Sequence, residues 1–394
     1  MTERPYPHVL IAGAGLSGLA LAQILRKEGV SFEIFERDVS ESARSQGWAI
    51  ALHGPLLAGL KESMPEDIGP IDQTNHLLPL DHLPAQFVFY DANKPGMRIG
   101  VNDDENGHIV RANRQRLRDW LRTFIPVQYG KRVARVDDSG EEIVVHFEDG
   151  SLASGDILIG AEGTRSVALL QVRKHILHGQ DVLTPLPVGS LVGEIELTGA
   201  DFARQLELGH SAYVVMGDAK DQCSMFAAIN KVSPDGKTGH YYFLLHWVDE
   251  QATLSTESNP YWAVNASLLV ERYRRPGIVL HAVELDASQL PPGRVMLMGD
   301  AAHSMTPFRG EAGVCALSDA LSLGRTITAI RDKSAKKADL ESLMVTYRDE
   351  MLKRAAKSIS VSNPVIGAYA RDPNYKLYTC GKEALPLPNE VINI

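Results

Sequence analysis

The sequence feature that most constrains the fold is a strand–turn–helix–strand pattern in residues 8–36. A short apolar strand, HVLIA, leads directly into the turn GAGLSG, whose glycines are Gly13, Gly15 and Gly18. Apolar residues then recur with helical spacing, and a second strand, FEIFE, ends on the acid Glu36. This order is typical of a dinucleotide-binding βαβ unit, in which the glycines permit a tight turn, approach of a pyrophosphate and close helix packing. We predict that Glu36 binds ribose hydroxyls, which favours FAD or NAD over NADP at this site.

A second cluster of small residues, within residues 294–324, predicts another part of a ligand site. A buried-looking strand over 295–298 runs into Gly299 and Asp300, and Pro307 lies in the turn that follows. Asp300, at the carboxyl end of a strand, can accept hydrogen bonds from sugar-like hydroxyls. A helical run is expected from Val314 onward, and its start favours negative charge on a ligand. The small residues before it are Gly310, Ala312 and Gly313.

Arginines form a third group of candidates. Residues 109–124 are predicted to hold a helix whose apolar face contains Leu117, Leu121 and Phe124. Five arginines cluster in the same stretch, and we expect most of them to be solvated, as charge runs on helices usually are. Arg114, at the expected helix start, could reach a dinucleotide, although spacing alone does not distinguish it from Arg111.

The loop that follows the βαβ unit also carries candidates. In residues 40–51, Arg44 precedes Gly47, which begins the strand-like segment GWAIA. Arg44 is equally consistent with a contact to a phosphate or flavin edge and with an exposed loop position. We retain both residues as candidates for a cofactor site.

Composition excludes several classes of protein. The chain has 394 residues and a net charge of −9, which is unlike nucleic-acid binders. The longest apolar run, residues 9–25, is interrupted by glycines and does not suit a membrane span. Three cysteines lie far apart without metal-ligand spacing, so we expect reduced thiols and no metal site. We therefore predict a soluble, cytoplasmic protein with no nucleic-acid partner and no integral membrane segment, of undetermined oligomeric state.

Three motifs, taken in order, resemble those of the single-component (group A, aromatic-hydroxylase-like) FAD-dependent monooxygenases. They are GAGLSG with Glu36, the stretch 156–166 that ends in GAEGTRS, and GDAAHSMTPFRGEAG. The segment NRQRLRDWL also resembles the R-x-x-L-x-x-x-L segment of this family, which singles out Arg114. The sequence TPFRGEAG within the third motif is similar to that of fungal family members in secondary metabolism. One residue departs from the family pattern, because Glu162 stands where aspartate is usual.

The resemblance implies FAD as cofactor and a role for several residues. Glu36 would bind the adenosine ribose, and the three glycines of GAGLSG would lie under the pyrophosphate. Arg114 would contact the FAD chain, Asp300 the ribityl or pyrophosphate region, and residues 310–313 the pyrimidine edge of the flavin. A helix N-terminus there would favour the negative charge of reduced flavin.

The resemblance also implies a reaction. NAD(P)H, as cosubstrate, would reduce FAD, O₂ would add to the flavin as a hydroperoxide, and one oxygen would hydroxylate or epoxidise a small apolar or aromatic organic substrate. Ring-expanding insertion uses the same flavin machinery. No catalytic acid or base is assigned. Candidates to line the substrate pocket are His210, Tyr213, His246 and Trp247, although buried aromatic residues usually belong to a core.

The resemblance and the pattern of elements together predict an α/β fold. A Rossmann-like, para-hydroxybenzoate-hydroxylase-like FAD domain would be interrupted by a mostly antiparallel β-sheet substrate domain and followed by a C-terminal helix. The FAD-binding parts would span 1–75 (the βαβ unit), 109–175 (with a hairpin layer) and 286–335 (with the GD motif). The substrate domain would take 76–108 and 176–285, with a helix near 261–274, and 336–394 would form a late helix and tail.

Two alternatives remain open from the sequence. One is another FAD-linked oxidoreductase or a halogenase-like flavoprotein, but the halogenase stretch W-x-W-x-I-P is absent from the sequence. The other is a non-enzymatic escort or binding module on the same nucleotide fold. Asp300 in its GDAAH context argues against a module, because such a protein needs no ribityl anchor.

Overall fold

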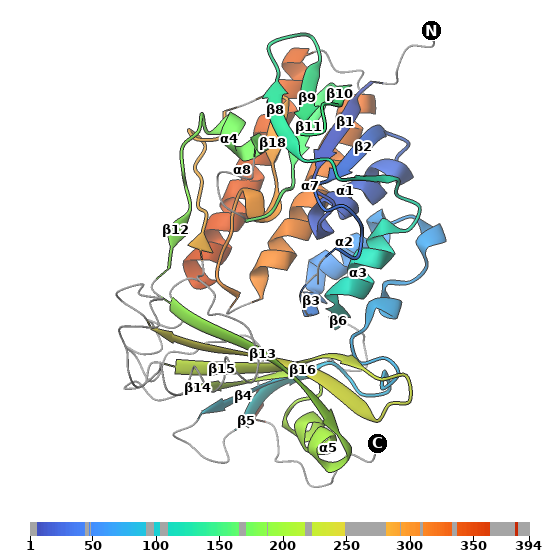
Figure 1. Ribbon diagram of the computed structural model, residues 1–394, viewed down its shortest axis with the longest axis vertical. Helices are drawn as coiled ribbons and strands as arrows, with labels where there is room; N and C mark the ends of the chain where they lie inside the picture. The colour runs from blue at the N-terminus through green and yellow to red at the C-terminus, as the bar shows by residue number, and fades with distance from the viewer. Residues whose placement is uncertain are drawn as a thin grey trace.

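The computed structural model of the chain describes residues 6–43, 47, 49–91, 98–102, 109–164, 171–186, 188–216, 223–248, 281–291, 293–307, 310–332, 337–362 and 383–384. Its elements form two stacked parts (Figure 1). A parallel sheet with helices occupies the upper part, and a large, mostly antiparallel sheet lies below it. The predicted α/β fold with an inserted antiparallel sheet is confirmed.

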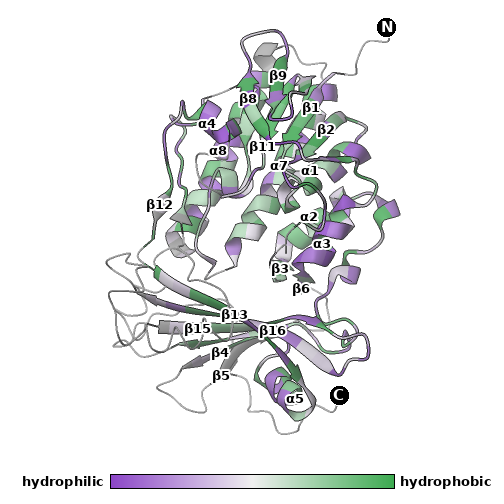
Figure 2. Cartoon of the chain, in the orientation of Figure 1, coloured by the Kyte–Doolittle hydropathy of each residue, from purple (hydrophilic) through white to green (hydrophobic). Residues whose placement is uncertain are grey.

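The upper part is built on a five-stranded parallel sheet in the order β18-β11-β1-β2-β7. Its strands are β1 (His8–Ala12), β2 (Ser31–Glu36), β7 (Val127–Tyr129), β11 (Ile157–Gly160) and β18 (Val295–Leu297). Every residue of β1 and β11 is buried, as expected for parallel strands covered on both faces. Both strands are coloured as hydrophobic in Figure 2.

Two long helices and a shorter one pack around this sheet. They are α1 (Leu16–Lys27), α7 (Glu311–Asp332) and α8 (Lys337–Ser362). α1 and α7 approach closely because Gly324 faces Ile24: a Cβ at Gly324 would lie 2.6 Å from the Ile24 Cγ2. α8 corresponds to the predicted late helix over 340–360.

A small antiparallel sheet lies on one end of this part. It has the order β10-β9-β8, from β8 (Val133–Asp137), β9 (Ile143–Phe147) and β10 (Leu152–Gly155). The hairpin predicted over 133–147 is thus present with a third strand, and α4 (Gln171–Ile176) packs against β8. A short ladder joins β12 (Thr184–Pro185) to β17 (His281–Ala282).

The lower part is a seven-stranded sheet in the order β13-β16-β15-β14-β4-β5-β19. Four strands come from the middle of the chain: β13 (Val188–Thr198), β14 (Ala212–Met216), β15 (Cys223–Val232) and β16 (Thr238–Val248). The others are β4 (Gln86–Asp91), β5 (Arg98–Asn102) and β19 (Glu383–Ala384). All pairs are antiparallel except β14 with β4. One face packs on α5 (Gly199–Leu208), which lies below the sheet in Figure 1.

A two-stranded ribbon lies where the two parts meet (Figure 1). It pairs β3 (Ala49–His53) with β6 (Ile109–Asn113) in antiparallel register. α2 (Gly54–Ser63) follows β3, the short helices η1 (Glu66–Ile68) and η2 (Ile71–Thr74) come next, and α3 (Arg114–Arg122) follows β6.

α3 starts at the expected residue, Arg114, but its C-terminal end corrects the sequence prediction. Residues 109–113 form a strand, and the helix begins at Arg114, where Asn113 caps it by accepting a hydrogen bond from the Arg116 backbone N–H (3.0 Å). The placement of Phe124 on the apolar helix face is wrong. The helix ends before Phe124, whose φ is +61° and whose side chain is 67% exposed. The helix predicted near 261–274 lies outside the described residues.

Candidate functional site

The turn after β1 is packed tightly at two glycines. Gly13 has φ +117°, and a Cβ there would lie 2.3 Å from the carbonyl oxygen of Ala161. A Cβ at Gly18, inside α1, would lie 2.0 Å from the carbonyl oxygen of Gly13. At Gly15, in contrast, a Cβ would meet nothing within 4 Å. The turn is therefore closed against β11 and α1 but open at Gly15, the N-cap residue of α1.

Glu36 braces this turn from the end of β2. Its side chain is 5% exposed, and its Oε2 accepts a hydrogen bond from the Ala14 backbone N–H at 3.0 Å. Its Oε1 accepts from the Asp38 backbone N–H at 3.0 Å. The first turn of α1 contains no acidic residue, and Gly15 offers no side-chain cap. The free N–H groups and the helix dipole therefore favour an anion at this end of α1.

The turn at Gly299 and Asp300 lies directly against the start of α1. It forms the short helix η3 (Gly299–Ala301) after β18, with φ +62° at Gly299. A Cβ at Gly299 would lie 3.1 Å from the Ser17 Oγ and 3.2 Å from the Ala316 Cβ. The fold thus brings the two glycine-containing motifs together, with the partly exposed Asp300 beside them.

α7 begins at Glu311, earlier than the predicted start at Val314. Its first turn contacts the ribbon, because a Cβ at Gly313 would lie 3.0 Å from the Ile50 Cδ1 on β3. This end of α7 therefore lies at the junction of the two parts. The other predicted residues beside it are Pro307, Gly310 and Ala312.

The arginines of α3 correct a second prediction. Arg118, expected to be solvated, is 2% exposed. Its Nε donates to the Ala14 carbonyl oxygen at 3.3 Å, and its Nη1 donates to the Glu41 carbonyl oxygen at 3.0 Å. Arg118 therefore supports the glycine turn from the other side. Arg114 is exposed and lies beside Gly47, where a Cβ would be 3.4 Å from the Arg114 Cδ.

Arg111 is also buried, on β6, so the expectation that most of these five arginines are solvated is wrong. The remaining two, Arg116 and Arg122, are partly buried. Arg44 lies outside the described residues. Helical spacing gave no signal for the burial of Arg118, because Arg114, four residues earlier on the same side of the helix, is exposed.

Three of the four predicted lining residues lie away from the face of the large sheet that contacts the ribbon. The Tyr213 hydroxyl donates to the Gln205 Oε1 of α5 at 2.8 Å, on the opposite face. The Trp247 ring covers Gly189, where a Cβ would be 2.1 Å from the Trp247 Cε2. His210 precedes β14, and its Nδ1 lies 3.1 Å from the Pro84 carbonyl oxygen.

His246 lies on the other face. Since side chains alternate along a strand, His246 shares its face of β16 with Tyr242, which contacts the ribbon through Arg111. The register places Ser190 and Ser224 on either side of it. Burial lowers the pKa of His246 to about 4, so its imidazole is neutral near pH 7.

A buried charge network lies behind the Gly299–Asp300 turn. The His303 Nε2 is 2.5 Å from the Asp319 Oδ2, which also accepts from the Gly299 backbone N–H at 2.9 Å. The Arg354 Nη2 donates to the Asp319 Oδ1 at 2.8 Å. Burial alone would raise the pKa of Asp319, but His303 and Arg354 outweigh it and hold that pKa below its usual range. The network ties the turn to α7 and α8.

Glu162, the departure from the family motif, lies just after β11. Its Oε2 accepts a hydrogen bond from the Val172 backbone N–H at 3.2 Å. Burial raises its pKa to about 7, and this effect outweighs the opposing influence of that hydrogen bond and of Arg37 and Arg173. The guanidinium of Arg173 is itself buried.

We expect Glu162→Gln to remove a pH dependence of stability. Because the folded-state pKa of about 7 lies above the ordinary 4.5, burial of Glu162 costs least when it is protonated. The contribution of protonated Glu162 to the free energy of unfolding is therefore complete below pH 4.5 and is lost as the pH rises through 7. Between pH 5 and 8 the free energy of unfolding of the wild type should fall relative to the variant, by on the order of 1–3 kcal/mol. Denaturant unfolding of both proteins across this range measures it, and parallel pH profiles would contradict it.

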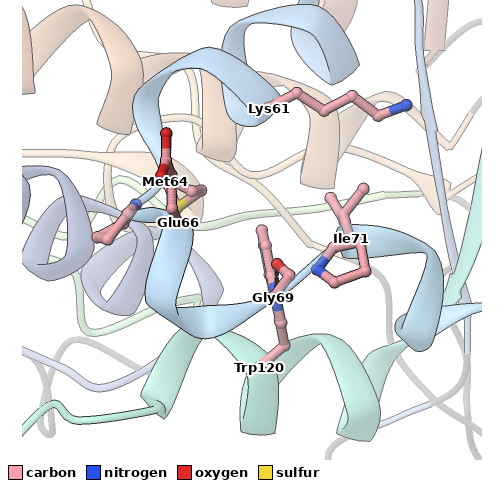
Figure 3. Close-up of a pocket in the computed structure, with 8 residues that line it drawn as sticks. Lys61, Met64, Glu66, Gly69, Ile71 and Trp120 are labelled. Carbon is pink, nitrogen blue, oxygen red and sulfur yellow. Dashed lines mark hydrogen bonds between the residues drawn. The ribbon is translucent and has the colours of Figure 1, made fainter.

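A pocket of about 270 Å³ lies elsewhere, between α2, η2 and α3 (Figure 3). It contains none of the predicted cofactor residues; its lining is Lys61, Met64, Pro65, Glu66, Gly69, Pro70, Ile71 and Trp120. Within the described parts of the chain, no group of His, Cys, Asp and Glu side chains could hold a metal ion. No helix in those parts is long and apolar enough to span a membrane.

Comparisons with known proteins agree with this geometry. A family model described as FAD binding domain matches residues 6–53 and 117–362. The FAD-dependent monooxygenase thnD of Trichoderma harzianum is 41% identical over 382 residues, covering 90% of this chain and 92% of that protein. The FAD-dependent monooxygenase cctM of Talaromyces islandicus is 26% identical over 375 residues, covering 90% and 91%. The chain belongs to the FAD binding domain family and is an FAD-dependent monooxygenase.

Solved structures share the fold. The 2,6-dihydroxypyridine-3-hydroxylase of Arthrobacter nicotinovorans has a TM-score of 0.71 at 20% identity and covers 99% of this chain and 100% of its own. HpxO of Klebsiella pneumoniae, complexed with FAD and uric acid, has a TM-score of 0.64 at 22% identity, with coverages of 93% and 92%.

Proposed function

We propose that this FAD-dependent monooxygenase uses NAD(P)H and O₂ to hydroxylate or epoxidise a small apolar or aromatic organic substrate in secondary metabolism. The observation that carries the proposal is the packing of Gly299 against Ser17, which places Asp300 beside the first turn of α1. One extended dinucleotide can then contact both motifs. The names of the fungal relatives support the reaction class.

The residues fit FAD along this path. The adenosine ribose would meet Glu36, whose carboxylate now accepts backbone N–H groups, and the pyrophosphate would pass Gly15, where the backbone is open. Asp300 would bind the ribityl or pyrophosphate region, and Arg114 the FAD chain. The flavin end would lie near Pro307 and the start of α7.

When bound, FAD would supply the redox chemistry, in which NAD(P)H provides the electrons and one oxygen atom of O₂ reaches the substrate. The protein positions the cofactor and the substrate and excludes water from the site. The start of α7, with its free N–H groups, would stabilise negative charge on the flavin edge near Gly313. Ile50 and the upper face of the large sheet, with neutral His246, would exclude water from the reacting atoms.

Assays on the purified protein test this proposal. We expect a yellow protein that oxidises NADH or NADPH and consumes O₂ faster when a suitable phenol is added, and that transfers ¹⁸O from ¹⁸O₂ into product. An FAD-loaded protein that oxidises neither nucleotide with any member of a broad phenol panel would contradict it. A colourless protein that cannot be reconstituted with FAD would instead favour the binding module.

Asp300→Ala should weaken FAD binding with little loss of fold. Asp300 is partly exposed, so its removal leaves no cavity, whereas a hydrogen bond between its carboxylate and a hydroxyl contributes about 1.5–3 kcal/mol. The dissociation constant of FAD should therefore rise about 10- to 100-fold, as measured by fluorescence titration. Asp332→Ala, at the far end of α7, is the matched control. Unchanged FAD affinity in Asp300→Ala would remove this residue from the site.

A further inference from the structure

Arg111 occupies the face of the ribbon that meets the large sheet. Along β6, Val110 and Ala112 are buried in the core of the upper part, and the alternating Arg111 and Asn113 face the opposite way. Asn113 donates from its Nδ2 to the carbonyl oxygen of Asn230 on β15 at 2.8 Å. Arg111 therefore lies between the ribbon and the face of the sheet that carries Tyr242 and Phe226.

The guanidinium of Arg111 is buried among aromatic side chains. Arg111 is 8% exposed, and its Nη2 donates to the Tyr242 hydroxyl at 3.0 Å. Its Cζ lies 5.7 Å from the centroid of the Phe226 ring. Its Nε has no hydrogen-bond partner among the residues that the structure describes. Tyr242 and Phe226 come from adjacent strands of the sheet, so the cation is held by aromatic groups on that side.

No carboxylate among the described residues forms an ion pair with Arg111. Its backbone carbonyl oxygen lies 2.6 Å from the Nδ1 of the buried His76. Burial and the positive charge of Arg111 lower the pKa of His76 to about 3, so His76 is neutral and adds no charge. Arg116, the next nearby cation, donates to the Asn75 carbonyl oxygen. A buried cation without a counter-ion is unfavourable, and such groups are usually paired.

We propose that Arg111 binds an anionic oxygen group of the substrate, a carboxylate or an ionised phenol, with the substrate ring beside Phe226. Rigid N–H donors of a guanidinium suit a planar anion, and an aromatic face next to it suits a planar ring. The ribbon contacts the start of α7 through Ile50, which lies on the face opposite Arg111. This inference rests on the proposed function, because it names the substrate class of that site.

A stability comparison separates ligand binding from a structural role. Arg111→Met replaces the cation by an apolar chain, and the Ala49 backbone still hydrogen-bonds the Tyr242 hydroxyl. We expect the Tm of the FAD-loaded variant to equal or exceed that of the wild type, because the substitution removes a buried charge that has no ion-pair partner in the described parts of the chain. Asn230→Ala is the matched control, because it removes a neutral contact of the same ribbon, the hydrogen bond from the Asn113 Nδ2 to the Asn230 Oδ1 (3.0 Å). If Arg111→Met lowers the Tm by about 3 °C or more beyond the change seen in Asn230→Ala, Arg111 has a structural role, and the proposal is overturned.

A binding comparison tests the charge preference. Benzoate and 4-nitrophenolate serve as anionic probes, and benzamide and 4-nitroanisole as their neutral counterparts, in thermal-shift and flavin-absorbance titrations. In the wild type and in Asn230→Ala we expect at least one anion to bind 10-fold or more tightly than its neutral counterpart, and which anion does so identifies the oxygen group. Arg111→Met should abolish the difference. Equal binding of anion and neutral probe in the wild type, or a preference that survives in Arg111→Met, would overturn the proposal. Oxidation of NAD(P)H without a substrate reports on the proposed function separately.

Discussion

Asp319→Ala should lower the free energy of unfolding by about 3–5 kcal/mol, the range for removing one partner of a buried ion pair. Asp319 is fully buried and holds His303, Arg354 and the Gly299 backbone N–H. Without its carboxylate, the His303 imidazole, the Arg354 guanidinium and the Gly299 backbone N–H lose their acceptor, and the side chain of His303 is almost fully buried. Urea unfolding of the FAD-free protein measures the loss.

A second readout identifies the cause of that loss. Burial by itself would lower the pKa of His303, but the Asp319 carboxylate outweighs burial and raises it. In Asp319→Ala the pKa of His303 should therefore fall below its usual range, as an NMR titration of the imidazole would show. Asp332→Ala, on the exposed end of the same helix, should change the free energy of unfolding by less than about 0.5 kcal/mol. Equal losses in the two variants would contradict the network as a source of stability.

Local sequence order was sufficient to predict the βαβ unit and the Gly299–Asp300 turn. Both motifs are strand–turn–helix units whose geometry is set within a few residues by glycine and by apolar periodicity. Their juxtaposition depends on the parallel order of β1, β11 and β18, which right-handed crossovers impose on such units. The contact between Gly299 and Ser17 is therefore information that only the structure supplies, whereas the local form of each motif is as the sequence predicted.

The start of α3 was predictable from the sequence. Asn113 is a favoured N-cap residue, and it marks the helix start that the structure shows at Arg114. The charge run over 109–124 gave no sign of two buried arginines, Arg111 on the strand and Arg118 on the helix. Neither could be recognised from charge, because each is buried by a distant segment: the Phe226 and Tyr242 strands in one case and the glycine turn in the other.

The face of the large sheet that meets the cofactor domain was not predictable. Alternation assigns Tyr213 and His246 to faces of their own strands, but it does not say which face α5 covers. α5 packs on the Tyr213 side through Gln205, which leaves His246 on the side of the ribbon. This choice depends on tertiary packing between segments far apart in the chain, and no local pattern in the sequence reports it.

Gly18→Ala should destabilise the protein by about 3 kcal/mol or prevent folding, whereas Gly15→Ala should leave the fold intact. The Cβ at position 18 would lie 2.0 Å from a backbone oxygen, that of Gly13, so α1 would have to move away from the turn. At position 15 a Cβ meets open space, and the backbone is extended with φ −76°. Gly15→Ala should therefore change the free energy of unfolding by no more than about 1 kcal/mol.

The two glycine variants together separate packing from ligand binding. If the pyrophosphate passes Gly15, the methyl group of Gly15→Ala would occupy part of its path, and the FAD dissociation constant should rise at least 10-fold, equivalent to about 1.4 kcal/mol. Thermal unfolding of both variants and fluorescence titration of Gly15→Ala with FAD provide the measurements. Equal destabilisation of the two variants would contradict the packing role of Gly18. Unchanged FAD affinity in a folded Gly15→Ala would show that the pyrophosphate does not pass this turn. It would then contradict the proposed path of FAD from Glu36 to Asp300.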